Sequence, residues 1–146
     1  MSETEVTLED LNFEVRNILV LVDMKHADHA DKALNLAAWI GRAMSAQLTL
    51  MTVAYPLGKH IADVPEKRKP DFLEYTKRQS QKHGITMDPL FTVHESVVYE
   101  VVRVAEKLKI DLIILQSGPT KLVEHVLGSK ASNISLKSKC SVFVVR

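Results

Sequence analysis

The stretch NILVLVD, residues 17–23, decides the fold of this chain. It is a continuous apolar run with a polar residue at each end. Such a run is typical of a strand that is buried on both faces, as in a parallel sheet. Similar stretches are QLTLMTVAY (47–55), DLIILQ (111–116) and SVFVVR (141–146). A fifth, ITMDPLFTV (85–93), contains Pro89, which has no amide hydrogen to donate, so this strand is expected at a sheet edge.

The segments between these strands predict helices. Residues 26–45 place apolar side chains at spacings of three and four residues, and the polar stretch 71–83 ends in His-Gly, as a helix C-cap does. Residues 96–109 are rich in valine but keep helical spacing, with Ser96 as the N-cap. A last helix is predicted over residues 129–137. Residues 56–70 hold three prolines and are interpreted as a loop suited to a lid.

Strands therefore alternate with helices along the whole chain. This alternation predicts a parallel sheet with helices on both faces, in the α/β class. Ligands of such sheets bind beyond the carboxyl ends of the strands. The first strand ends at Asp23 and the fourth at Gln116, so both ends are expected at the same rim.

Composition narrows the range of functions. The 146 residues carry a net charge of +1, so no bulk attraction to nucleic acid or to a membrane surface is expected. The longest apolar runs are far shorter than the ~20 residues of a membrane span. The acidic, polar start is unlike a secretory signal, and the single cysteine, Cys140, fits a reducing compartment. We therefore expect a cytoplasmic protein with a flexible acidic arm (residues 1–14) and one domain (15–146).

The stretch SGPTKLVEHVLGSK, residues 117–130, follows the fourth strand. Gly118 stands just past the strand, and Gly128 and Ser129 stand at the start of the next predicted helix. Backbone amides beside glycine at a helix start can hold phosphate, to which Lys130 would add charge. A turn glycine followed by an N-cap serine explains the same residues. The residues alone leave both interpretations open.

The chain resembles the universal stress protein family over residues 15–146. The family's nucleotide-binding members carry Gly-x2-Gly-x9-Gly-Ser/Thr after the fourth strand, and Gly118, Gly128 and Ser129 match its last three elements. ILVLVD, VVRVAEKLKIDLIIL and CSVFVVR match further family patterns. The resemblance implies a three-layer sandwich with a five-stranded parallel sheet of order 3-2-1-4-5, a Rossmann-like topology of the adenine-nucleotide-hydrolase type.

The resemblance also implies a site for ATP or another adenine nucleotide, with Mg²⁺ as a possible companion. Asp23 would lie by the adenosine, and Val53 would bind adenine through its backbone. Gly118, Gly128 and Ser129, helped by Lys130, would hold the phosphates. Two departures weaken this expectation. Leu115 stands where the motif has its first glycine, and Glu95 replaces a glycine in the loop after the third strand.

Other chemistry finds less support in the sequence. HADHADK, residues 26–32, offers His26 and His29 with Asp28 and Asp31, which is typical of a polar first helical turn as well as of a metal site. No residues match a hydrolytic motif, so no catalytic residue is assigned and at most a slow ATPase is expected. Cys140 is interpreted as a buried structural thiol.

Two functional hypotheses follow. The first is a stress-response module that binds an adenine nucleotide and acts as a dimeric switch. The second is a dimeric interaction protein that binds no nucleotide, because Leu115 and Glu95 replace glycines. In both, the apolar edge strand from Ser141 to Arg146 is expected to form a homodimer, and a regulatory protein partner remains unidentified.

Overall fold

The computed structural model describes residues 14–56, 64–117 and 126–146, and the predicted acidic arm lies outside them except for Glu14. The strands are β1 (Asn17–Leu21), β2 (Gln47–Ala54), β3 (Met87–Val93), β4 (Leu112–Gln116) and β5 (Ser141–Val145). The α-helices are α1 (Asp31–Met44), α2 (Lys69–His83), α3 (Val97–Lys107) and α4 (Val126–Lys137). Two 3-10 helices, η1 (Met24–Ala30) and η2 (Pro65–Arg68), precede α1 and α2.

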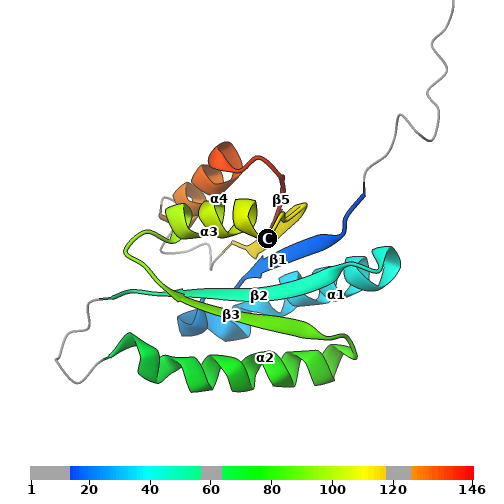
Figure 1. Ribbon diagram of the computed structural model, residues 1–146, viewed down its shortest axis with the longest axis horizontal. Coiled ribbons are helices and arrows are strands. Elements are labelled where there is room, and N and C mark those ends of the chain that lie inside the picture. Colours follow the sequence, from blue (N-terminus) through cyan, green and yellow to red (C-terminus); the bar gives the residue numbers. More distant parts are fainter. Residues whose placement is uncertain (1–13, 57–63, 118–125) are drawn as a thin grey trace, which may run out of the picture.

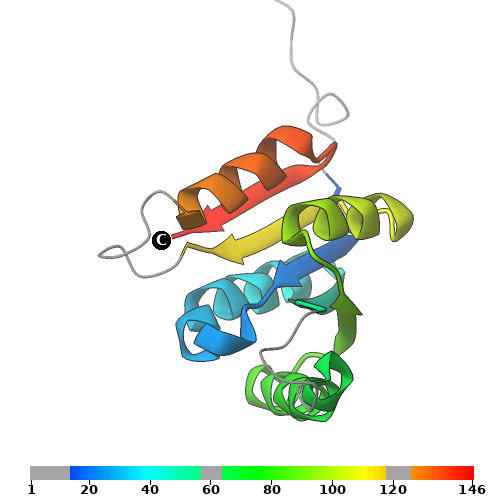
Figure 2. The same ribbon diagram turned by 90° about the vertical axis from the view of Figure 1, so that its left-hand side faces the viewer.

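All strand pairs are parallel, and the sheet order is β3-β2-β1-β4-β5. The predicted order is therefore confirmed. Helices α3 and α4 lie over one face of the sheet, and α1 and α2 lie over the other (Figure 1). Figure 2 shows the same three layers from the side, with α4 beside β5 and α2 farthest from it.

Each face of the sheet has its own hydrophobic core. Alternate side chains along β1 and β4 point to opposite faces, as the pleat requires. The core on the α1/α2 face includes Ile18, Val20 and Ile114, whereas the core on the α3/α4 face includes Leu19 and Ile113. All five are fully buried. Burial on both faces explains why the central strands are apolar throughout rather than alternating.

The helix predicted over residues 26–45 is two segments. The first is the 3-10 helix η1, in which His26 has non-helical backbone angles (φ −131°, ψ 41°), and only from Asp31 does a regular α-helix run. Asp23 caps the first segment by accepting a hydrogen bond from Lys25 N at 3.0 Å. The capped segment therefore begins at Met24 and adds seven residues before the regular helix, with the kink at His26 inside it.

Three further boundaries differ from the predictions. The proline-rich stretch 56–70 is not loop throughout, because η2 occupies Pro65–Arg68 and α2 begins at Lys69. Helix α4 begins at Val126, so Ser129 is inside its first turn and is not its N-cap. Residues 57–63, the centre of the predicted lid, lie outside the described residues. The predicted ends at Gly84 and Ser96 are confirmed: Gly84 ends α2 in the left-handed region, and Ser96 caps α3.

Candidate functional site

The carboxyl ends of the five strands meet at one rim of the sheet, because all strands are parallel. Asp23 follows β1, Val53 lies next to the last residue of β2, and Gln116 ends β4. Strand β1 is the point at which the winding reverses, since β2 lies on one side of it and β4 on the other. Crevices at such reversal points bind ligands in open α/β sheets. The rim therefore holds two of the predicted site residues, Asp23 and Val53.

Val53 offers unpaired backbone groups at this rim. In a parallel ladder, successive residues turn their backbone groups to opposite neighbours. Met51 O accepts from Val22 N on the β1 side at 2.9 Å, and Ala54 O accepts from His94 N on the β3 side at 3.0 Å. Val53 has the same parity as Met51, so its N–H and C=O face β1. That strand has ended at Leu21, and the described part of the chain supplies no backbone partner for Val53 outside the regular ladders.

Asp23 lies where the chain leaves the sheet. Its carbonyl oxygen accepts from His26 N at 2.9 Å, and its carboxylate accepts from Lys25 N at 3.0 Å. These bonds turn the chain into η1 directly after β1. The side chain of Asp23 is exposed, with one carboxylate oxygen used by the cap. The other oxygen can therefore accept a hydrogen bond from a ligand.

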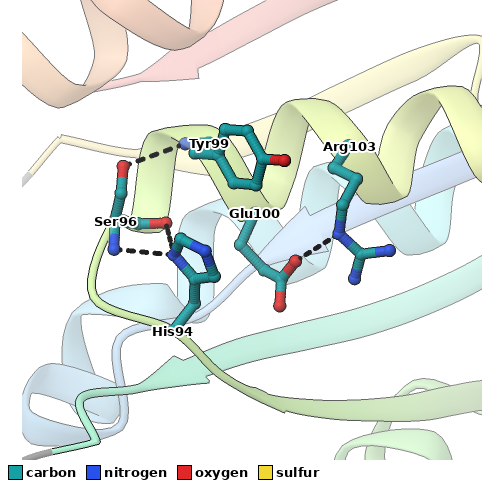
Figure 3. Close-up of polar contacts among 5 residues, drawn as sticks. All are labelled: His94, Ser96, Tyr99, Glu100 and Arg103. Atoms are coloured by element: carbon teal, nitrogen blue, oxygen red, sulfur yellow. Dashed lines mark hydrogen bonds and ion pairs between the residues drawn. The ribbon is translucent and has the colours of Figure 1, made fainter.

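The corner between β3 and α3 forms a second wall of the rim, shown in Figure 3. His94 Nδ1 accepts from Ser96 N at 2.8 Å, and the carbonyl oxygen of Ser96 lies 3.1 Å from the same nitrogen. Ser96 Oγ accepts from Tyr99 N at 3.1 Å, and the rings of His94 and Tyr99 stack with centroids 5.0 Å apart. These contacts fix the start of α3 against the end of β3.

A buried carboxylate lies one position further along α3. Glu100 is only 4% exposed, and its Oε1 accepts from Arg103 Nε at 2.6 Å (Figure 3). This hydrogen bond, together with the charge of Glu100, raises the pKa of Arg103 above its ordinary value. Removing Arg103 would leave a buried carboxylate without that partner, which is costly. Sequence patterns did not single out this pair, because a glutamate three residues before an arginine is ordinary on an exposed helix face.

The two departures from the family motif occupy different places. Leu115 is 6% exposed and belongs to the core on the α3/α4 face, together with Ala131 and Ile134 of α4. Its backbone pairs with Leu21 on one side and with Val144 on the other. Leu115 therefore fills space between β4 and α4 at the rim, where glycine would leave a hollow. Glu95 is exposed and directly precedes the cap of α3.

The structure describes only some of the predicted phosphate-binding residues. Gly118 lies outside the described residues, as does the stretch 119–125 that follows it. Gly128 and Ser129 are the third and fourth residues of α4. Lys130 follows them in α4 and is exposed. The predicted phosphate contacts therefore depend, among the described elements, on the end of β4 and the start of α4.

Gln116, which the sequence places at this rim, makes a contact that the sequence did not reveal. Its Oε1 accepts from Ala33 N, in the first turn of α1, at 3.4 Å. Helix α1 has no side-chain cap of its own, so Gln116 supplies one from β4. The two residues are 83 positions apart, and no local pattern marks such a contact.

The histidines of HADHADK do not form a metal site with their neighbours. The rings of His26 and His29 have centroids 6.0 Å apart, and His29 Nε2 lies 3.7 Å from a carboxylate oxygen of Asp28. Across residues 14–56, 64–117 and 126–146, no three histidine, cysteine, aspartate or glutamate side chains are grouped as metal ligands. Within the same ranges no helix has the length and apolar character needed to cross a membrane.

A hollow lies at the other end of the sheet. It has a volume of about 640 Å³ and is lined by α3, by the start of β4 and by the connection from α4 to β5. Asp111, Glu106 and Cys140 are among its lining residues. Burial raises the pKa of the Cys140 thiol, so the thiolate is disfavoured there. This hollow contains none of the predicted site residues.

Comparison with known proteins agrees with this architecture. Residues 14–146 match the universal stress protein family. A universal stress protein solved in complex with cAMP is 23% identical, with a TM-score of 0.71 over 90% of this chain and 97% of that chain. One from Archaeoglobus fulgidus in complex with dAMP is 21% identical (TM-score 0.67; 90% and 98%), and one from Arabidopsis thaliana with AMP bound is 12% identical (TM-score 0.62; 89% and 90%). No curated protein sequence matches the chain.

Proposed function

Because this chain belongs to the universal stress protein family, we propose that it is a stress-response module that binds an adenine nucleotide at the carboxyl rim of its sheet. The nucleotide acts as a regulatory ligand, and fast turnover is not part of its role. Structural relatives hold cAMP, dAMP and AMP, which supports the choice of ligand class.

The unpaired backbone of Val53 is the observation that carries the proposal. Adenine presents a ring-nitrogen acceptor next to an amino donor on one edge. The N–H and C=O of Val53 face the same gap and form the complementary donor and acceptor. A site built to pair both groups rejects a base that presents the reverse pattern, because buried polar groups would then lack partners. Guanine has that reverse pattern, so selectivity for adenine is expected.

Asp23 supplies the second contact in this proposal. Its carboxylate stands beside the gap in front of Val53 and has acceptor capacity beyond its bond to Lys25 N. The hydroxyl groups of a ribose are donors that such a carboxylate can bind. Gly118, Gly128, Ser129 and Lys130 remain the proposed phosphate contacts, and Mg²⁺ is needed only if a polyphosphate binds.

Mass spectrometry of the purified protein and calorimetry with AMP test this proposal. We expect bound AMP and at least about tenfold weaker binding of GMP. Asp23→Asn keeps a good helix cap and should weaken AMP binding about tenfold, through loss of a charged hydrogen bond. Asp28→Asn is the matched control in the same exposed segment and should leave affinity unchanged. Absence of AMP and ATP binding at millimolar concentration would refute the proposal.

A second candidate function is a family member that works only through protein contacts. Leu115 and Glu95 favour it, since one fills space under α4 and the other places a negative charge at the rim. This candidate predicts no binding of any adenine nucleotide. The calorimetric experiment above therefore separates the two functions directly.

The dimer forms through β5 in either function. Strand β5 is an edge strand, and Phe143 on it is 46% exposed. Ser117 N donates to Val145 O at 2.7 Å, so the backbone groups of Val142 and Val144 face away from β4. Val142→Pro deletes one outward donor without touching the β4 ladder, and Val142→Ala is its control. Light scattering should give a dimer for the wild type and the control, and a monomer for Val142→Pro.

Two finer expectations belong to the same proposal. ATP hydrolysis should not exceed a slow background rate, because the described rim offers Asp23 but no recognisable arrangement for a metal and a positioned water. A phosphate-release assay that gave turnover at ordinary enzyme rates would contradict this. The proposed location is the cytoplasm, and cell fractionation tests it.

A further inference from the structure

Three of the helix starts at the carboxyl rim, those of η1, α1 and α3, each have an amide that a side chain of this chain already occupies. Free amides at a helix start are what usually holds a phosphate. Asp23 accepts from Lys25 N at the start of η1, Gln116 accepts from Ala33 N at the start of α1, and Ser96 accepts from Tyr99 N at the start of α3. A phosphate at any of these places would compete with a protein acceptor.

Two carboxylates stand at the same helix starts. Asp23 caps η1, and Glu95 directly precedes the cap of α3. Both side chains are exposed. Each repels an incoming anion, and the repulsion grows with the charge of that anion. Lys130, exposed on α4, offsets one of these charges. The described rim thus disfavours a triphosphate more than a monophosphate, and a monophosphate more than an uncharged nucleoside.

The floor of the rim is apolar where a nucleoside would lie. Leu21, Val53, Val97 and Val98 are half-buried and pack against the core on the α3/α4 face. Leu115 closes the floor between β4 and α4. Apolar side chains suit the faces of a base and the carbon atoms of a ribose, whereas they offer phosphate oxygens no hydrogen bonds.

We propose that the rim recognises the adenosine part of its ligand and selects against additional phosphates. This inference rests on the function proposed above and narrows its ligand class to adenosine and adenosine monophosphates. The contacts to base and ribose then supply most of the affinity, and each phosphate beyond the first contributes nothing or weakens binding.

Calorimetry of the full chain with adenosine, AMP and ATP, each with and without Mg²⁺, tests the inference. Adenosine and AMP should bind within about threefold of each other, and ATP at least about fivefold more weakly than AMP. ATP binding tenfold tighter than adenosine would overturn the inference and leave the proposed function standing. If none of the three bound at millimolar concentration, both would fail.

Glu95→Gln sharpens the test without disturbing the core, because this side chain is exposed. It should strengthen ATP binding about threefold and leave adenosine binding unchanged, since it removes one repelling charge. Glu106→Gln, at the opposite end of the sheet, is the matched control and should change neither affinity. Equal shifts for ATP and adenosine in Glu95→Gln, or no shift for ATP, would contradict the role assigned to this charge.

Discussion

The two ends of the sheet differ in what their polar groups do. At the amino end, Asp111 accepts from Arg16 N and Asn17 N, each at 2.8 Å, and Lys139 pairs with Glu106 at 3.2 Å. That end also has the 640 Å³ hollow. At the carboxyl end, the backbone groups of Val53 face the side of β1, and the described part of the chain supplies no partner for them outside the regular ladders.

This difference leads us to expect a ligand where hydrogen-bonding groups lack described partners, rather than where a hollow lies. A buried or half-buried polar group without a partner costs free energy until something binds it. At the amino end, these polar groups are already paired with one another around the starts of β1 and β4. At the carboxyl end, the described residues leave the backbone donor and acceptor of Val53 without a partner outside the regular ladders, so a ligand is expected there and not in the hollow.

The largest effect expected at either end is from Leu115→Ala. Leu115 is 6% exposed and packs under α4, so its truncation should lower the free energy of unfolding by about 2–5 kcal/mol. Urea denaturation measures this. Leu136→Ala is the control, because that side chain is 81% exposed and should change stability little. A small loss in Leu115→Ala would mean that the floor of the rim is not part of the core.

Asp111→Ala should have the next largest effect. The substitution leaves two backbone amides without their acceptor and should cost about 1–3 kcal/mol, with AMP affinity unchanged. Asp88→Ala is the control, since Asp88 accepts only from the side chain of Gln47 among its described bonds. Loss of AMP binding in a folded Asp111→Ala protein would place the ligand at the amino end and break the comparison.

Ser96→Ala tests the corner between β3 and α3. Loss of the cap should cost about 1 kcal/mol, because Tyr99 N loses its side-chain acceptor. The same variant frees an amide at the rim, so ATP binding should not weaken. Ser132→Ala, at an exposed position of α4, is the control. Equal stability of the two variants would show that the cap contributes nothing.

The smallest effect at neutral pH is expected for Tyr75→Phe, and its pH dependence is the informative part. Burial, and next the charge of Asp31, raise the pKa of Tyr75 to about 12. A raised pKa in the folded state means that stabilisation is complete below the ordinary pKa of 10 and is lost as the pH rises from there to about 12. The urea midpoint of the wild type should fall over that range, and that of Tyr75→Phe should fall less. Parallel pH profiles for the two proteins would contradict this.

Most of the fold could be predicted from local patterns. Runs such as residues 18–22 and 112–115 are apolar throughout because both faces of the central strands are covered, and Pro89 marks an edge because it cannot donate. Boundaries were less predictable. The kink at His26 arises because the cap by Asp23 and the regular helix from Asp31 do not join smoothly, which residue spacing cannot show.

The site was predictable only where chain order fixes position. Asp23 and Val53 fall at one rim because parallel strands end together. The acceptor role of Gln116 and the burial of Glu100 depend on contacts between distant elements or on the tilt of α3, and neither leaves a local pattern. The place of Leu115 under α4 likewise became clear only from packing.

Backbone amide shifts in a ¹⁵N–¹H spectrum, recorded on the full chain during titration with AMP, test the central claim most directly. Binding at the carboxyl rim predicts the largest shifts at Val53 and at residues 21–25, with Glu95 and Ser96 also affected. Residues around the amino-end hollow, such as Lys109 and residues 138–141, should remain unchanged. Large shifts at the hollow with none at Val53 would contradict the account.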